Sequence, residues 1–196
     1  FHTWTAEECA AFEARWPLGT KARTAYAIGL YLAARRSDAI RLGRPMERGG
    51  EVTYTQHKNR ARSPVRITQP VLPPLRAALE ACQGKGLTWL ETDYGRPFSL
   101  DGFGNRFRAW CAEAGLPEAC GFHGLRKATA ARLAEAGVSS RQIMAVLGDR
   151  TLEQAETYTR AADNARMTRD ALGGLYGEPV CLTASRVRRN RRKSQA

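Results

Sequence analysis

The chain has 196 residues, of which 43% are hydrophobic, so it can bury a core as one large domain or two small ones. No apolar run approaches the ~20 residues that span a bilayer, and the start has neither Met nor a signal-peptide pattern. The net charge of +12, with a pI near 10.1, instead predicts a polyanionic partner such as nucleic acid.

The first half of the chain combines helix signals with one strand signal. Residues 5–8 form a capping-box pattern before an apolar helix face, and further helices are predicted over residues 20–35 and 37–42. Apolar residues alternate at positions 52 and 54 and again at 65 and 67, which predicts a β-hairpin. The turn of this hairpin, residues 56–63, is strongly basic.

Helix patterns dominate the second half. A helix opens at the two prolines after Leu72, a short β-like piece covers residues 87–92, and a helix with an aromatic face ends at Gly115. Four more helices are predicted: one over residues 123–136, and others that begin at Ser139, Thr151 and Asp163. We therefore expect a mainly α fold with a small antiparallel β-sheet (α+β), as one domain over residues 1–176.

Residues 177–196 form a basic tail that we expect to be disordered. It holds six arginine and lysine residues against one glutamate, so +7 of the net charge remains with the folded part. The five cysteines are scattered without a CxxC pair, and the three histidines are isolated in the sequence. We therefore expect reduced thiols in a cytoplasmic protein, with no metal site, no cofactor and no membrane association.

Several basic and aromatic positions are candidates for chemistry. Arg35 lies at a break between helices, Lys58 in the hairpin turn, His123 and Arg126 on one face of a first helical turn, and Tyr158 in a later helix. Taken singly, each has an ordinary explanation: helix-dipole pairing, a solvated turn, an exposed charged face, or amphipathic packing. Only their order along the chain makes a functional interpretation stronger than these.

This order resembles that of the tyrosine recombinase (phage integrase) family, as do the local sequences. These are LAARRSDAIRL at 32–42, QHKN at 56–59, GFHGLRKATAARL at 121–133, and IMAVLGDRTLEQAETYTRAAD at 143–163. The resemblance covers nearly all of residues 1–176 and implies the catalytic-domain fold of that family. Four matching segments in order make a chance resemblance remote.

The resemblance implies an enzyme that cuts and rejoins DNA without metal or ATP. Arg35 and Arg126 would bind the non-bridging oxygens of the scissile phosphate, since guanidinium groups match phosphate geometry. Lys58 would protonate the leaving 5′ oxygen, and His123 would assist proton movement or orient the phosphate. Tyr158 would attack and form a 3′-phosphotyrosine. Further DNA contacts are expected from Arg36, Arg60, Arg62 and Lys127.

One position departs from the family pattern. Asp149 stands nine residues before Tyr158, where family members usually carry His or Trp. The usual side chain donates a hydrogen bond to the phosphate, whereas an ionised carboxylate cannot donate and repels it. Three interpretations are open: Asp149 turns away to pair with Arg150 or Lys58, it is protonated, or it marks a crippled enzyme. We favour a retained but slower chemistry.

The sequence thus predicts a site-specific recombinase or integrase of a bacterial or phage mobile element. We expect it to act on double-stranded DNA as a homotetramer, and the sequence is compatible with a monomer in the absence of DNA. The DNA-clamping N-terminal domain of the family has no counterpart here, so we interpret the chain as a fragment. The alternatives are a type IB topoisomerase, a catalytically silent DNA-binding relative, and a basic RNA- or ribosome-binding protein. Trapping a covalent adduct on nicked DNA separates the enzymes from the others.

Overall fold

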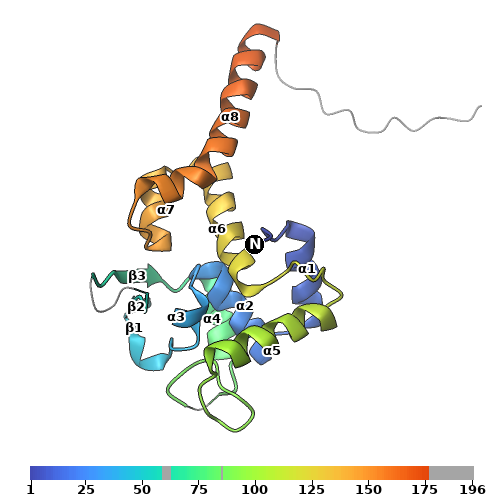
Figure 1. The fold of residues 1–196 in the computed structure, drawn as a ribbon, viewed down its shortest axis with the longest axis vertical. Coiled ribbons are helices and arrows are strands. Elements are labelled where there is room, and N and C mark those ends of the chain that lie inside the picture. Colours follow the sequence, from blue (N-terminus) through green and yellow to red (C-terminus); the bar gives the residue numbers. More distant parts are fainter. Residues whose placement is uncertain (59–62, 85, 177–196) are drawn as a thin grey trace, which may run out of the picture. The chain divides into compact units, whose positions relative to one another are not determined.

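The structure, a computed structural model, describes residues 1–58, 63–84 and 86–176. The chain divides into two units, residues 1–163 and 164–196, which are described separately. The first unit is mostly helical and carries a small antiparallel sheet, which confirms the predicted fold class (Figure 1). None of the helices in the described ranges combines the length and apolar character of a membrane span. The domain boundary predicted at residue 176 stays a prediction, and the basic tail lies outside the described residues.

The first helix begins where its cap was predicted. α1 (Ala6–Arg15) starts at a capping box, in which the Glu8 amide donates to the Thr5 hydroxyl (3.2 Å) and the Thr5 amide donates to the Glu8 carboxylate (2.8 Å). This reciprocal pair satisfies two donors that the helix cannot satisfy itself. The helix then buries Cys9 and Phe12 against the core.

The second helix lies at the centre of the first unit. α2 (Lys21–Tyr31) is buried almost throughout and packs against α4 (Pro73–Glu80), α5 (Leu100–Glu113) and α6 (Phe122–Glu135) (Figure 1). It ends earlier than predicted because Ala33 adopts a left-handed conformation, with φ of 46°. Such a conformation costs an L-residue about 1–2 kcal/mol, so packing must hold this turn.

The predicted hairpin is present as two strands of a three-stranded sheet in the order β1-β2-β3. Val52, Tyr54 and Ile67 are buried on the inner face, as their alternation predicted. The strand predicted over residues 87–92 is wrong, because that segment forms only isolated bridges to Gly43 and Pro97. The three strands are β1 (Glu47–Arg48), β2 (Glu51–Thr55) and β3 (Arg66–Pro70).

Two hydrophobic clusters hold the first unit together. The larger is rich in aromatic rings that meet stacked or edge-on, which is the favoured geometry for such pairs: Trp4, Phe12, Tyr26, Phe103, Phe107 and Phe122. The smaller cluster is made mostly of alanines and lies where α6, α7 (Ser140–Leu147) and the start of α8 (Leu152–Tyr176) meet: Ala33, Ala130, Ala134, Ile143, Leu147 and Ala155. Small side chains there allow the helices to approach closely.

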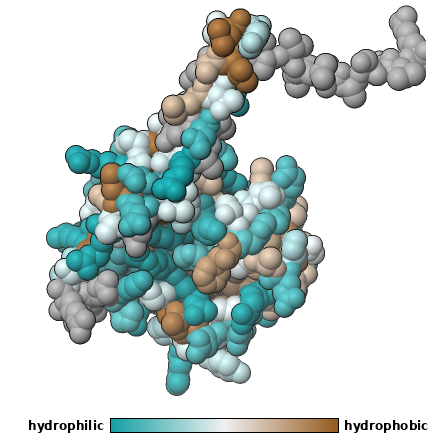
Figure 2. Space-filling model, turned by 45° about the horizontal axis from the view of Figure 1, so that its top comes forward, coloured by the Kyte–Doolittle hydropathy of each residue, from teal (hydrophilic) through white to brown (hydrophobic). Residues whose placement is uncertain are grey.

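The last helix does not restart at Asp163 as predicted, since α8 (Leu152–Tyr176) runs without interruption into the second unit. In that unit the helix exposes Met167, Leu172, Leu175 and Tyr176. Figure 2 shows hydrophobic atoms at this C-terminal end of α8, and mainly polar side chains over the rest of the displayed face. The remaining elements are α3 (Arg36–Ala39), η1 (Arg44–Met46) and α7 (Ser140–Leu147).

Candidate active site

Two arginines and one aspartate form the centre of the candidate site. Arg126 Nη2 and Arg35 Nη2 both donate to the same oxygen of Asp149, at 2.7 and 2.9 Å. The side chains of Arg126 and Asp149 are 4% and 10% exposed, so this is a largely buried cluster of two positive charges and one negative charge. Arg35 is 22% exposed, and its Nη1 is buried without a hydrogen-bond partner among the described residues.

The turn between α2 and α3 contacts Arg126 and also carries Arg35. The left-handed turn at Ala33 brings its carbonyl to Arg126, whose Nη1 donates to it at 2.8 Å. Arg35 follows two residues later as the N-cap of α3. Burial lowers the pKa of Arg126, as does the neighbouring Arg35, while Asp149 acts in the opposite direction. The carboxylate therefore offsets part of the repulsion between two converging guanidinium groups.

Of the three interpretations of Asp149, the one in which it turns away to pair with Arg150 or Lys58 does not match the structure. Among the described residues, its carboxylate contacts Arg35 and Arg126, whereas Arg150 donates to the Ser63 hydroxyl at 3.2 Å. The sequence analysis expected Arg126 to bind a phosphate oxygen. In the structure, an internal carboxylate already pairs with this arginine.

Tyr158 lies in the second turn of α8 and packs against the alanine-rich cluster. Its hydroxyl pKa is raised above the ordinary value, first by burial and also by Asp149, whereas Arg126 lowers it. The phenol is thus close enough to the arginine–aspartate centre to be influenced by both charges. The structure brings three of the predicted catalytic side chains into direct contact, namely Arg35, Arg126 and Asp149, and Tyr158 packs against the neighbouring alanine-rich cluster.

His123 occupies the first turn of α6, and its ring is tilted against that of Phe1 with centroids 4.6 Å apart. Burial lowers the pKa of His123, and the positive charges of Arg126 and Lys127 lower it further. Both effects favour the neutral form of the imidazole, which can accept a proton. Lys127, predicted to contact DNA, donates to the carbonyl of Phe1 at 2.7 Å.

Lys58 is exposed just beyond β2, at the edge of the undescribed segment 59–62. The residue before it is fixed, since the amide of His57 donates to Asp38 Oδ1 at 2.7 Å. Asp38 is 2% exposed, and burial raises its pKa, partly offset by the His57 hydrogen bond and by Arg35. Asp38 was assigned no role in the sequence analysis, although it lies three residues after Arg35 in the matching segment.

Two glutamines that the sequence analysis missed join the hairpin to α7. Gln56 Nε2 donates to the carbonyl of Leu147 (3.0 Å), and Gln69 Nε2 donates to that of Val146 (2.8 Å). Gly148 follows in a left-handed conformation, with φ of 61°. A Cβ at this position would collide with Gln56 Nε2 and with Ile67 Cδ1. The hairpin with Lys58 and the turn with Asp149 are therefore packed against each other.

Of the three remaining predicted DNA contacts, the structure describes one. Arg36 is exposed, and its guanidinium group lies against Gly104 of α5, where a Cβ would collide with it. Arg60 and Arg62 lie outside the described residues. Arg36 was predicted only as a DNA contact, and its packing against α5 was not predicted.

Comparisons with known proteins agree on the class of fold. A lambda integrase dimer bound to a COC′ core site is similar with a TM-score of 0.66 and 21% identity, covering 81% of this chain and 47% of that one. XerH recombinase in a post-cleavage complex on a palindromic difH substrate is similar with a TM-score of 0.65 and 17% identity. This match covers 87% of this chain and 52% of the XerH chain. The lambda integrase catalytic core is similar with a TM-score of 0.61 and 20% identity, covering 76% of this chain and 91% of that core.

The fold is that of a tyrosine recombinase catalytic domain, and the chain spans about half the length of the longer integrase and recombinase chains. The phage integrase family matches residues 8–165. This chain belongs to the phage integrase family. No curated protein shows significant sequence similarity to it.

Proposed function

We propose that this chain is the catalytic part of a site-specific DNA recombinase that acts through a phosphotyrosine on Tyr158. The observation that carries the proposal is the convergence of Arg35 and Arg126 on one carboxylate oxygen. A carboxylate and a phosphate bind guanidinium groups in the same way, so the oxygen of Asp149 marks a point where a phosphate oxygen would be bound. Arg35 Nη1, which lacks a partner among the described residues, offers a further donor that a phosphate could use.

The proposed reaction follows from these positions. The two arginines neutralise the phosphate as negative charge develops on its equatorial oxygens. The Tyr158 oxygen attacks the phosphorus, and the bond to the 5′ oxygen of the next nucleotide breaks. His123, which is neutral, accepts a proton or orients the phosphate, and Lys58 protonates the leaving 5′ oxygen. Reversal of these steps by a second 5′ hydroxyl rejoins the strand, because the bond energy is conserved in the phosphotyrosine.

Asp149 favours a second candidate function, that of a weakened or silent DNA-binding relative. Its carboxylate occupies the arginine pair and raises the pKa of Tyr158, so it opposes both phosphate binding and ionisation of the nucleophile. DNA must displace this carboxylate before the phosphate can bind both arginines. Loss of one transition-state hydrogen bond typically slows an enzyme by about 10²–10³-fold. We expect slow cleavage rather than none, since the remaining groups are present.

A suicide-substrate experiment separates these candidates. The chain is incubated with nicked duplexes of randomised sequence, from which the cleaved strand end diffuses away and leaves a denaturant-resistant adduct. We expect an adduct on Tyr158, identified by mass spectrometry, that is absent from Tyr158→Phe. Asp149→His should increase its rate of formation by about 10²-fold, because it restores a donor and removes the competing charge.

An adduct with Asp149→His alone would identify the natural chain as a silent relative. The lambda integrase catalytic core serves as the positive control. If that core forms an adduct while neither form of this chain does, the enzyme proposal is wrong. Relaxation of supercoiled plasmid without an enriched target sequence would indicate a topoisomerase instead.

We also propose double-stranded DNA as the partner and assembly into tetramers on it. The net charge of +12 supports DNA binding through phosphate contacts. A groove of about 350 Å³ between α2, β3, α6 and α7 is lined largely by apolar groups, including Leu30, Leu72 and Leu133. The exposed apolar residues at the end of α8 have a matching chemistry and could enter this groove in a neighbouring copy.

Light scattering with and without DNA tests the assembly. We expect a monomer alone and a multimer on DNA, and Leu175→Glu should abolish the multimer without weakening binding of one copy. Leu133→Glu, on the groove side, should have the same effect. Multimers that are indifferent to both substitutions would exclude this contact.

A further inference from the structure

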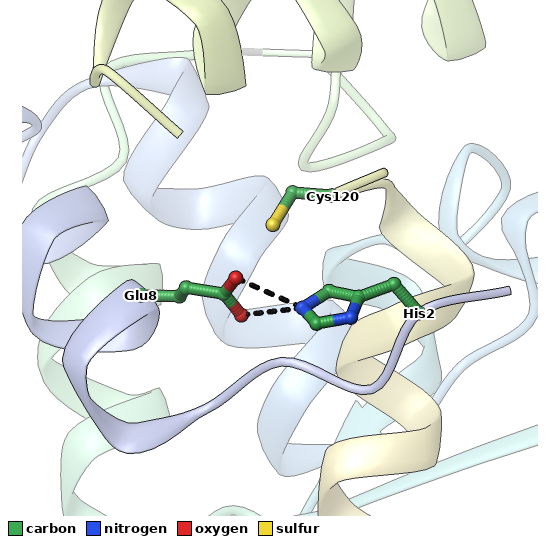
Figure 3. Close-up of side chains that lie close together, drawn as sticks. All are labelled: His2, Glu8 and Cys120. Carbon is green, nitrogen blue, oxygen red and sulfur yellow. Dashed lines mark hydrogen bonds and ion pairs between the residues drawn. The ribbon is translucent and has the colours of Figure 1, made fainter. Parts of the chain in front are cut away.

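Three side chains that can bind a metal converge at the N-terminal end of α6. His2 belongs to the N-terminal segment, Glu8 to the first turn of α1, and Cys120 to the turn before α6. Their ligand atoms all lie within 4.8 Å of one another. Figure 3 shows the imidazole, the carboxylate and the thiol directed toward a common space.

The contacts within this cluster go beyond an ordinary ion pair. His2 Nε2 lies 2.9 and 2.8 Å from the two oxygens of Glu8, so one nitrogen faces both carboxylate oxygens. An ion pair would account for these two residues, and the Thr5 amide completes the helix cap. It does not account for Cys120, which is 1% exposed and whose Sγ lies within 4.8 Å of the ligand atoms of both His2 and Glu8.

We propose that His2, Glu8 and Cys120 bind one zinc ion. Imidazole nitrogen, thiolate sulfur and carboxylate oxygen are the three ligand types that zinc uses in proteins, whereas calcium and magnesium prefer oxygen ligands alone. Binding would release the thiol proton to solvent. One carboxylate, one thiolate and a neutral imidazole then balance the two charges of the ion, so no net charge is left in a half-buried site.

Zinc requires only a small rearrangement of these groups. Bonds of about 2.0–2.3 Å in tetrahedral geometry place ligand atoms about 3.5 Å apart. Since the three ligand atoms lie within 4.8 Å of one another, each pair must approach by at most about 1.3 Å. His2 can supply this movement, because its side chain is 33% exposed and belongs to the N-terminal segment. The exposed side of His2 leaves the fourth position to water.

The proposed ion would fasten the N-terminal segment to the start of α6. That segment already lies directly on the helix, since the Trp4 indole donates to the Gly121 carbonyl (3.1 Å) and a Cβ on Gly124 would lie 2.5 Å from the His2 carbonyl oxygen. A metal link between residues 2 and 120 closes a long loop and restricts the unfolded chain. It would also fix Phe1 against His123, and so join a structural site to the candidate catalytic helix.

Metal titration of the chelator-treated chain tests the proposal. We expect one zinc per chain by calorimetry with atomic-emission analysis, and a higher melting temperature with zinc. Cobalt(II) should give the strong visible bands of a tetrahedral site and a near-ultraviolet thiolate charge-transfer band. His2→Ala should weaken binding by at least about 10–100-fold, the loss typical of changes even outside the ligand sphere. Glu8→Gln keeps the helix cap and should weaken it similarly.

Cys120→Ser should remove the charge-transfer band, whereas Cys82→Ser, a thiol outside the cluster, should leave it unchanged. His2→Ala keeps the proposal testable even if Cys120→Ser does not fold, because His2 is outside the core. Binding that survives His2→Ala and Glu8→Gln, an octahedral cobalt spectrum, or the absence of one-to-one binding would each overturn the proposal. None of these readouts depends on recombinase activity.

Discussion

At Asp149, one carboxylate oxygen accepts hydrogen bonds from two arginines that would otherwise repel each other. This residue therefore has two opposed effects. It stabilises the arginine pair in the absence of DNA, and it competes with a phosphate for the same donors. The two effects can be separated by measuring stability and chemistry on the same variants.

The first prediction concerns the pH dependence of cleavage. Asp149→Asn removes a negative charge that raises the pKa of Tyr158, so the pKa of Tyr158 should fall. Because tyrosine attacks after losing its proton, the rising limb of the pH–rate profile should move to lower pH. Ultraviolet titration of tyrosinate, with Tyr158→Phe as the reference, measures the same shift without DNA. An unchanged limb would mean that Asp149 does not influence the nucleophile.

The second prediction concerns stability. Arg126→Met removes a buried charge partner of Asp149 and a donor to the Ala33 carbonyl, so unfolding free energy should fall by about 3 kcal/mol. The double variant with Asp149→Leu should recover part of this loss, because no uncompensated carboxylate remains. Urea unfolding of the two single variants and the double variant measures the coupling. Strictly additive losses would contradict the pairing.

At the scale of elements, the junction between the hairpin and α7 depends on glycine at position 148. Gly148→Ala introduces a Cβ at φ of 61° and against Gln56 and Ile67, whereas Gly115→Ala introduces one at φ of 69° with nothing within 4 Å. The control should lose about 1 kcal/mol for its backbone alone, and Gly148→Ala at least about 1 kcal/mol more. Thermal or urea unfolding of both compares them. Equal losses of unfolding free energy in the two variants would show that the junction accommodates the added Cβ without destabilisation.

Local signals predicted most elements, while contacts between elements escaped prediction. The capping box at Thr5 and the alternation at Val52 and Tyr54 act within a few residues, so the sequence exposes them directly. The segment 87–92 failed because Trp89 and Leu90 are both buried, which irregular packing allows and a half-buried strand does not. The turn at Ala33 is held by packing and by the Arg126 hydrogen bond, both from residues remote in sequence, and no local pattern marks it.

In the candidate site, too, the residues could be predicted from the sequence, but the contacts between them could not. The order of Arg35, His123, Arg126 and Tyr158 along the chain could be read from matching segments. The two arginine partners of Asp149 could not be predicted, because both are remote in sequence and Arg150 is a nearer candidate. The glutamines at 56 and 69 escaped for a similar reason, since their acceptors are carbonyl groups that carry no sequence signature.

At the scale of the whole molecule, positive charge is shared between the folded part and the tail. Removing residues 177–196 deletes six basic residues and one acidic residue. If all six contact phosphates, the slope of log K against log salt should become less negative by up to about 5. Fluorescence anisotropy of labelled DNA across a salt series measures both slopes. Identical slopes would show that the tail does not bind DNA and that the folded part alone accounts for the affinity.

The glutamine contacts between the hairpin and α7 have a consequence for motion. Opening the hairpin would strip Val146 and Leu147 of their side-chain donors and release the turn that carries Asp149. Local unfolding of proteins proceeds in such cooperative units. The proposed acid, Lys58, and the carboxylate that occupies the arginine pair would then loosen together, so a single opening equilibrium would both expose the phosphate-binding arginines and free the group that protonates the leaving strand.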